Sequence, residues 1–169
     1  MDVTEQTLAY AIGECALGLF LVAESDRGIA AIFLGDRRER LLDELAAEFG
    51  DTMFAESPDA MAGTLADVAA FLDAPERGWD RPLDLQGSAL ERAVWMALQA
   101  VPAGRTTSYG AIAKALPVPA TAQEVGAACG ANRIAVAIPC HRVVKADGSI
   151  SGYRWGVWRK RKHLAREAA

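Results

Sequence analysis

The sequence is poor in the residues that cross-link small folds. Only three cysteines occur among 169 residues, Cys15, Cys129 and Cys140, and no two of them have CxxC spacing. An odd number of cysteines without paired spacing argues against a disulfide framework and against a structural zinc site, and is typical of a reducing compartment. We therefore expect a cytoplasmic protein that holds no metal.

Long hydrophobic runs are also missing. No stretch of roughly eighteen or more apolar residues occurs, which argues against a membrane-spanning helix. The opening residues MDVTEQTLAY lack the basic and apolar segments of a secretory signal peptide. Hydrophobic residues nevertheless make up 51% of the chain and charged residues 24%, a composition typical of a globular protein with a buried core.

Positive charge is scarce in the first half of the chain and negative charge is scarce in the second. Residues 1–84 contain 6 Lys and Arg against 18 Asp and Glu, and residues 85–169 contain 12 against 4, so balances of −12 and +8 underlie the net charge of −4. A basic half favours nucleic-acid binding, which depends on local rather than mean charge. The basic segment RWGVWRKRKHLAR can equally be a solvated terminal helix.

Three short apolar runs separated by turn residues open the chain, and we expect them to form a small sheet. They cover residues 8–15, 18–25 and 28–35. The SDRG segment between the last two predicts a tight hairpin. Two segments with helical spacing of apolar residues follow, at 36–49 and 57–73. In the second, Ser57 is the expected N-cap and Pro58 the first helical residue.

A linker rich in proline, glycine and charge, APERGWDRPLDLQG, follows the second helix. It coincides with the change of charge near residue 85, so we expect a domain boundary there. The predicted fold class is α/β (α+β). Residues 1–84 are expected to form a sheet-and-helix domain with a supporting role, and residues 85–169 a mainly helical domain.

Two capping boxes mark helix starts in the second half. Ser88 with Glu91 and Thr121 with Glu124 have the spacing at which side chain and backbone satisfy each other's hydrogen bonds. A further helix is expected between them, over residues 107–116. The last two of these three helices are short and joined by a proline-containing connection, which is typical of a helix-turn-helix.

The helix after Thr121 has almost no side-chain bulk. Its sequence AQEVGAACGAN contains two glycines, although glycine weakens a helix by about 1 kcal/mol relative to alanine. Either another helix packs closely against it or a nucleic-acid backbone lies along it. The apolar run RIAVAI that follows predicts an extended segment leading into the Pro139–Cys140 turn.

The motif IPCHRVV at 138–144 places a thiol beside a base and a cation. A cysteine reacts as its thiolate, which positive charge, a base or a helix N-terminus favours. Because adjacent side chains point in different directions, we expect a bridging water to carry the proton between Cys140 and His141. A carboxylate would then orient the imidazole, and Glu167 is the candidate in this acid-poor half. The alternative is that Cys140 is a buried structural thiol, as is usual for a free cysteine.

Several stretches together resemble the O6-alkylguanine-DNA alkyltransferases, also called methylated-DNA–protein-cysteine methyltransferases. They are SYG at 108–110, GAN at 130–132, IPCHRVV at 138–144 and SGYRWGVWRKRKHLARE at 151–167. The resemblance extends to VAESDRGIAAIFLGD and RPLDLQGSALERAVWMALQAVPAG, so it covers nearly the whole chain. It is strongest to the methyltransferase half of the bacterial Ada proteins.

The resemblance implies a single-turnover repair reaction on double-stranded DNA, without cofactor or metal. An O6-alkylguanine is rotated out of the duplex, and the thiol takes its methyl or other alkyl group irreversibly. O4-methylthymine is a further candidate substrate. The catalytic residues implied are Cys140 as the acceptor, His141 as the base, Glu167 as the acid that orients it, and Asn132 as the brace of the turn.

The resemblance also assigns residues that meet the lesion and the DNA. Those assigned to the flipped base are Tyr109, Val143, Tyr153 and Arg142. Those assigned to the DNA are Ser108, Thr121, Gln123, Ala127 and Gly130. The family usually carries an arginine at the position of Gln123, where it fills the gap left by the flipped base. We therefore expect weaker repair of duplex DNA than an arginine would give.

Two other functions remain open from the sequence. A lesion-sensing or damage-response module would bind the same base with weak transfer, and the loss of arginine at position 123 favours it. A cysteine hydrolase would need an oxyanion site, for which the sequence gives no signal. In each case we expect a monomer that binds no membrane.

Overall fold

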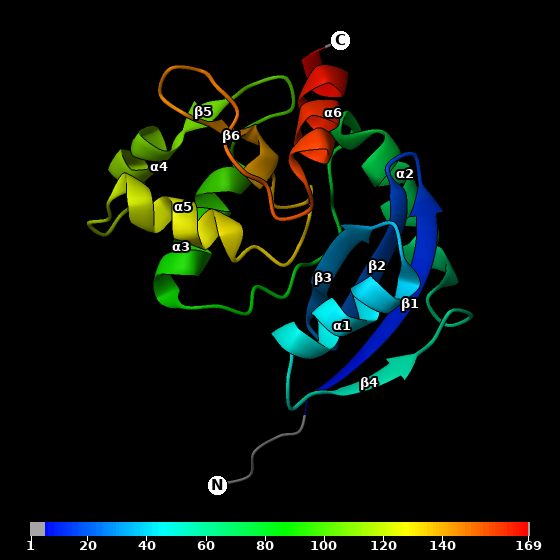
Figure 1. Ribbon diagram of the computed structural model, residues 1–169. Coiled ribbons are helices and arrows are strands. Elements are labelled where there is room, and N and C mark those ends of the chain that lie inside the picture. The colour runs from blue at the N-terminus through cyan, green and yellow to red at the C-terminus, as the bar shows by residue number, and fades with distance from the viewer. Residues whose placement is uncertain (1–5, 169) are drawn as a thin grey trace, which may run out of the picture. The chain divides into compact units, whose positions relative to one another are not determined.

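The computed structural model describes residues 6–168, and the chain divides into two compact units, 1–84 and 85–169 (Figure 1). The first is a sheet with helices and the second is mainly helical, as the sequence predicts for the fold class. Within residues 6–168, no helix has both the length and the apolar character needed to cross a membrane.

The first unit is built on a four-stranded sheet of order β3-β2-β1-β4. Its first three strands, β1 (Thr7–Cys15), β2 (Gly18–Ser25) and β3 (Gly28–Gly35), pair antiparallel and follow the three predicted apolar runs. The fourth, β4 (Met53–Glu56), pairs parallel with β1 and was not predicted. Its four residues are exposed or half-buried, so they lack the apolar signal of the other strands.

The end of the linker is held against β3. The Ile29 N–H donates to the Pro82 carbonyl at 2.9 Å, and the Asp84 N–H donates to the Ile29 carbonyl at 2.7 Å. This close approach needs Gly28, because a Cβ at this position would lie 2.4 Å from the Pro82 oxygen. Gly28 also has a φ of +145°, which side-chain-bearing residues rarely adopt. The Ser25 hydroxyl also donates to the Asp84 carboxylate at 2.6 Å. Residues 82–84 of the linker therefore join the first unit's sheet beside β3.

Two helices complete the first unit. Figure 1 shows α1 (Arg38–Glu48) in front of the sheet, against β2 and β3, and α2 (Ala62–Asp73) behind β1. The predicted N-cap at Ser57 is wrong, because α2 begins five residues later. The Ser57 N–H donates to the Tyr10 carbonyl at 2.9 Å, so Ser57 continues the sheet pairing and a turn precedes the helix. A short 3-10 helix, η1 (Pro75–Arg77), follows α2.

The second unit contains α3 (Ala89–Gln99), α4 (Tyr109–Ala115), α5 (Ala122–Gly130) and α6 (Val157–Ala168). Both predicted capping boxes, at the starts of α3 and α5, are present. The connection 116–121 joins α4 and α5, which pack together as a helix-turn-helix. Two short parallel strands, β5 (Thr107–Ser108) and β6 (Val143–Val144), link the start of α4 to the segment after Cys140.

The core of the second unit lies between α3, α4 and α5. Trp95 of α3 is 3% exposed, and its indole N–H donates to the Ala128 carbonyl of α5 at 2.9 Å. Val94, Leu98 and Val125 are fully buried around this contact. A buried indole N–H needs such a partner, so the bond fixes the position of α5 relative to α3.

The segment between α5 and Cys140 is not extended, and the prediction from RIAVAI is wrong. Val136 has a φ of +67°, and the Ala137 N–H donates to the Ala135 carbonyl at 2.7 Å, as in a γ-turn. The Cys140 N–H donates to the Ile138 carbonyl at 2.8 Å in a second tight turn. A β-branched residue is rare at positive φ, and this conformation costs roughly 1–3 kcal/mol. Contacts outside the local sequence must therefore hold the segment.

Candidate active site

Cys140 begins a short 3-10 helix, η2 (Cys140–Arg142), and lies at a pocket of about 270 Å³. The pocket is lined by Tyr109, Gly126, Cys129, Gly130, Cys140, Gly152, Tyr153 and Arg154. The Cys140 side chain is buried in the protein, with 5% of the residue exposed. The thiol is therefore shielded from bulk solvent but borders a cavity of the size that takes a small flat ligand.

The fully buried side chain of Asn132 braces the cysteine turn. Its Nδ2 lies 3.0 Å from the Ile138 carbonyl, 3.3 Å from the Ile134 carbonyl and 3.3 Å from the Cys140 sulfur. Its Oδ1 accepts from the Ile134 N–H at 2.9 Å. One amide thus holds both ends of the strained loop and the thiol itself. These contacts supply the support that the Val136 conformation requires.

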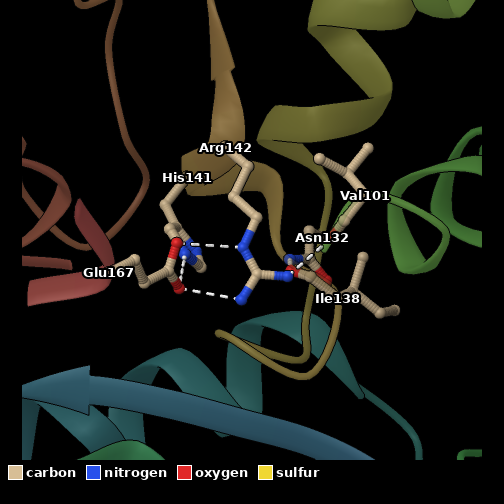
Figure 2. A network of polar contacts seen from close by, with 6 residues as sticks. All are labelled: Val101, Asn132, Ile138, His141, Arg142 and Glu167. Carbon is tan, nitrogen blue, oxygen red and sulfur yellow. Dashed lines mark hydrogen bonds and ion pairs between the residues drawn. The ribbon is translucent and has the colours of Figure 1, made fainter. Parts of the chain in front are cut away.

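His141 and Arg142, which follow Cys140 in the chain, form a buried polar network with Glu167 (Figure 2). The His141 Nε2 lies 2.8 Å from Glu167 Oε1, and the Arg142 guanidinium donates to both oxygens of the same carboxylate at 2.8 and 3.0 Å. Arg142 also donates to the Val101 carbonyl at 2.7 Å. The carboxylate is 1% exposed, so α6 carries an acid whose position is fixed by η2.

The electrostatics of this network favour a neutral imidazole beside an ionised acid. Burial would raise the pKa of Glu167, but hydrogen bonds from His141 and Arg142 outweigh it and lower the pKa to about 2. Burial lowers the pKa of His141, although Glu167 opposes the shift. A neutral imidazole next to a fixed carboxylate can accept a proton, because the carboxylate stabilises the imidazolium that forms.

The thiol itself is held in its protonated form. Burial raises the pKa of Cys140, while the Asn132 hydrogen bond and the charges of Lys160 and Arg154 oppose the shift. Sequence reasoning expected the neighbouring His141 and Arg142 to supply the favourable charge, but their side chains are directed to Glu167. The cations that act on the sulfur come from α6 and the loop before it.

Lys160 of α6 is one of these cations and is almost completely buried, at 1% exposure. Its Nζ donates to the Ser151 hydroxyl at 3.0 Å and lies 3.4 Å from the Gly152 carbonyl. Ser151 in turn is hydrogen-bonded to the Tyr109 hydroxyl. Burial lowers the pKa of Lys160, and the two buried cysteines oppose the shift. A polar chain therefore runs from a buried ammonium to a tyrosine that lines the pocket.

The low bulk of α5 serves the pocket rather than helix packing. A Cβ at Gly130 would meet no atom within 4 Å, and one at Gly126 would make only ordinary contact with the Tyr109 ring at 3.8 Å. Both glycines line the pocket. The two glycines are therefore not required for close helix packing, which was one of the two explanations open from the sequence.

A second thiol and a second imidazole lie in the same region. Cys129 of α5 lines the pocket, and burial raises its pKa to about 12. His163 of α6 has its ring centroid 4.8 Å from that of His141 and 6.0 Å from that of Tyr153. Burial, followed by the neighbouring His141, lowers the pKa of His163 to about 3. Both groups are therefore neutral at physiological pH.

The other predicted residues fall into three groups. Tyr109, Tyr153 and Gly130 line the pocket, whereas Arg142 and Val143 do not. The exposed residues of α5 and its cap include Thr121, Gln123 and Ala127. Thr121 and Ser108 also act as N-caps, since their hydroxyls accept backbone N–H bonds at 3.1 Å.

Sequence reasoning missed the pocket roles of some residues. Ser151, Lys160 and His163 belong to the site, as do Cys129 and Arg154. A faint signal existed for α6, because Lys160, His163 and Glu167 recur at spacings of three and four residues and share one helix face. Within residues 6–168, no group of three or more His, Cys, Asp or Glu side chains is placed to hold a metal ion.

Comparisons with known proteins agree on one family. The family model "6-O-methylguanine DNA methyltransferase, DNA binding domain" matches residues 89–169. The methylated-DNA–protein-cysteine methyltransferase of Mycolicibacterium paratuberculosis is 42% identical over 128 residues, covering 76% of this chain and 77% of that protein. The bifunctional transcriptional activator/DNA repair enzyme Ada of Escherichia coli K12 is 45% identical over 159 residues, covering 94% of this chain and 45% of Ada.

The fold comparison points the same way. The crystal structure of Mycobacterium tuberculosis OGT in complex with DNA matches with a TM-score of 0.79 and 31% identity, covering 95% of this chain and 92% of that one. The chain spans about half the length of the Ada proteins it matches, 45% and 46%. By sequence and by fold, the chain belongs to the methylated-DNA–protein-cysteine methyltransferase family.

Proposed function

We propose that this protein repairs DNA directly, by moving the alkyl group of an O6-alkylguanine onto Cys140 once per molecule. The observation that carries the proposal is the combination at Cys140: a thiol beside a pocket, a buried amide on its sulfur, and a buried imidazole–carboxylate pair on the next residue. The names of the relatives support the same reaction. No cofactor enters the proposal.

The first step is the removal of the thiol proton by His141. Its Nε2 is engaged by Glu167, whereas its buried Nδ1 has no hydrogen-bond partner among the described residues. A water between this nitrogen and the sulfur of Cys140 would carry the proton. Glu167, held by Arg142, keeps the ring in place and stabilises the imidazolium. Arg142 thus positions the acid and does not touch the base.

The second step is an in-line displacement at the alkyl carbon. A sulfur–carbon bond forms, the carbon–O6 bond breaks, and the bonding electron pair stays on the guanine, which then takes up a proton. The product is a thioether on Cys140 and an unmodified guanine. Because nothing removes the alkyl group from the sulfur, each protein molecule acts once.

The lesion has to leave the DNA stack to reach the thiol. The glycines of α5 and the rings of Tyr109 and Tyr153 would form the walls around the base, with Tyr109 donating toward it. The backbone around Cys140 and Val143 would accept from the amino group of the guanine. The O4 of an alkylated thymine is a second candidate for the same pocket.

Double-stranded DNA is the proposed partner, and the helix-turn-helix is the proposed contact. The residues proposed to meet the DNA are the half-buried Ser108 and the exposed Thr121, Gln123, Ala127 and Gly130. Residues 85–169 would carry both the DNA contact and the chemistry, and residues 1–84 would support them. We further propose a monomer that acts in the cytoplasm, where three free cysteines stay reduced.

Intact mass spectrometry after incubation with duplex DNA containing O6-methylguanine tests the proposal. We expect one added methyl group per chain, located on Cys140 by peptide mapping, and none on the Cys140→Ser variant. The Cys129→Ser variant is the matched control, because it replaces the other thiol of the pocket and should still accept one methyl.

The alternatives give different results in the same experiment. Binding of the lesion duplex without a change of protein mass would indicate a lesion-sensing module, which the replacement of the arginine by Gln123 favours. Repeated turnover of an ester by the unmodified protein would indicate a hydrolase. Methylation of Cys129 or Cys15 in place of Cys140 would contradict the proposed site.

A further inference from the structure

Arg154 carries the only formal charge among the eight residues that line the Cys140 pocket. Its Nη1 donates to the Asn132 backbone carbonyl at 3.0 Å, and its guanidinium carbon lies 5.4 Å from the centroid of the Trp155 ring. Trp155 is 4% exposed, so the cation rests on a fixed part of the unit. A guanidinium keeps its proton at any physiological pH, which makes this a permanent positive charge at the pocket.

The proposed reaction moves negative charge through this pocket. Before the transfer the charge is on the sulfur of Cys140, and after it the charge is on the departing guanine, shared between O6 and N1. A fixed charge accelerates a reaction only when it interacts more strongly with the transition state than with the ground state. A cation beside the guanine meets this condition, because the negative charge moves from the sulfur toward the cation during the transfer.

Lys160 is the other cation that acts on the sulfur, but it does not line the pocket. Its ammonium is directed to Ser151 and the Gly152 carbonyl. The two cations therefore lie in different places: Lys160 is held inside the unit by Ser151 and Gly152, and Arg154 lines the space that the base would fill.

We propose that Arg154 is a catalytic residue that stabilises the negative charge on the guanine as its bond to the alkyl group breaks. This inference rests on the proposed function and assigns a role in the chemical step. The electron pair of the carbon–O6 bond stays on the guanine, and Arg154 provides N–H donors and positive charge without losing a proton. The proton that neutralises the guanine comes from Tyr109 or from water.

The competing assignment for Arg154 is a contact with a DNA phosphate. A phosphate contact would contribute to affinity alone, because phosphates carry the same charge before and after the transfer. The anchor on Asn132 favours the catalytic role. This bond ties the guanidinium to the residue that also holds the Cys140 sulfur, so cation and nucleophile share one brace.

Two variants and one matched control test the role in DNA repair. Arg154→Gln removes the charge and keeps a side-chain amide that can donate to the Asn132 carbonyl, and Arg154→Lys keeps the charge. Arg133→Gln is the control, since Arg133 also donates to a backbone carbonyl of this unit, that of Gln86 at 2.6 Å, but does not line the pocket. Single-turnover transfer is measured at saturating O6-methylguanine duplex, with affinity measured separately.

We expect Arg154→Gln to slow transfer at saturating DNA by about 100-fold, the usual effect of losing one donor to a developing anion. Arg154→Lys should recover most of the rate, and Arg133→Gln should leave it unchanged at saturation. A loss of affinity with an unchanged saturated rate would overturn the proposal in favour of a phosphate contact.

Reaction of Cys140 with iodomethane separates stabilisation of the base from activation of the sulfur. Iodide leaves this reagent, so no guanine charge develops. Because Arg154 also favours ionisation of the thiol, we expect Arg154→Gln to lose some rate with iodomethane, but much less than with the lesion duplex, as followed by mass mapping of the Cys140 peptide. An equal loss with both reagents would assign Arg154 to the thiol or to the Asn132 brace and overturn the proposal.

Failure of the proposed function itself is distinguishable. The unsubstituted protein would then transfer no methyl from DNA to Cys140, although iodomethane still labels the thiol. That result would also exclude a role of Arg154 in base departure. Circular dichroism and urea unfolding of each variant confirm that the second unit is folded before the rates are compared.

Discussion

The two units of the chain bury different kinds of side chain. Among the described residues, the first unit has Thr64 as its buried polar side chain, and the rest of its core is hydrocarbon. The second unit buries Asn132, His141, Arg142, Arg159, Lys160 and His163. Burying a polar or charged group costs free energy unless it is fully paired, so the second unit gives up stability that the first retains.

The difference favours the proposed division of roles, with the chemistry in the second unit and a supporting role for the first. In the second unit two of the buried polar groups, Asn132 and Lys160, act on the ionisation of Cys140, which borders the pocket. The first unit holds its ionic groups at the surface, as with the exposed Arg38–Glu56 pair at 2.6 Å. If this comparison is right, equivalent substitutions in the two units should have unequal effects.

The largest expected contrast is between the two arginine–glutamate pairs. Arg142→Met leaves the buried Glu167 carboxylate with only His141 as partner, and loss of one partner of a buried pair costs about 3–5 kcal/mol of unfolding free energy. Arg38→Met breaks the exposed pair with Glu56 and should leave stability nearly unchanged. Urea unfolding followed by tryptophan fluorescence measures both. Similar losses in the two variants would break the comparison.

A smaller effect is expected from the acid sensitivity of His163. Its folded pKa of about 3 lies below its ordinary value of 6.5, so the unfolded chain binds a proton that the folded chain does not. The contribution of the neutral His163 to the free energy of unfolding is fully present above pH 6.5 and is lost as the pH falls toward 3. The effect between pH 7 and pH 5 is about 2 kcal/mol.

The His163→Leu variant measures this contribution. Its unfolding free energy should fall less between pH 7 and pH 5 than that of the unsubstituted protein, while the depressed pKa of His141 preserves part of the sensitivity. The groups that act on His163 are His141, Glu167, Arg166 and Arg142, and all remain in the variant. Hydrogen exchange should show the change in α6 and not in β1–β3. An identical pH dependence in variant and parent would contradict the assignment.

The smallest expected effect concerns the exposed face of α5. Gln123→Arg introduces the residue that the family resemblance implies at this position, and we expect transfer from duplex DNA to rise about tenfold, or about 1.4 kcal/mol. Ala66→Arg adds the same charge to an exposed position of α2 in the first unit and should change little. Single-turnover rates on duplex and on single-stranded lesion DNA are the measurement. Equal rates for the Gln123→Arg variant and the parent on duplex would refute the expectation.

Local signals in the sequence predicted much of the fold. The strands β1, β2 and β3 are continuous apolar runs, and the capping boxes of α3 and α5 are hydrogen-bond patterns complete within four residues. The sequence did not predict β4 or the N-terminus of α2, because pairing with β1 determines both. Ser57 has the chemistry of an N-cap, but pairing with Tyr10 outweighs this local preference.

Site residues within a polar motif could be predicted from the sequence. Site residues whose role depends on their burial in the folded protein could not. The motif IPCHRVV directed attention to Cys140 and His141, and the structure places His141 against Glu167. A lysine in the run RWGVWRKRKHLAR gives no sign of burial, since lysines are among the most exposed residues. Only the packing of α6 reveals that Lys160 is inside and its neighbours Arg161 and Lys162 are outside.

The γ-turn at Val136 has a consequence for how this protein can change over evolutionary time. The turn is held against the local preference of its own residue by the amide of Asn132, so the chain has accepted a penalty here that a glycine would remove. Whether a substitution in this loop is tolerated therefore depends on Asn132, which lies outside the turn. Such dependence makes sequence drift slow in a segment whose side chains take no part in the reaction.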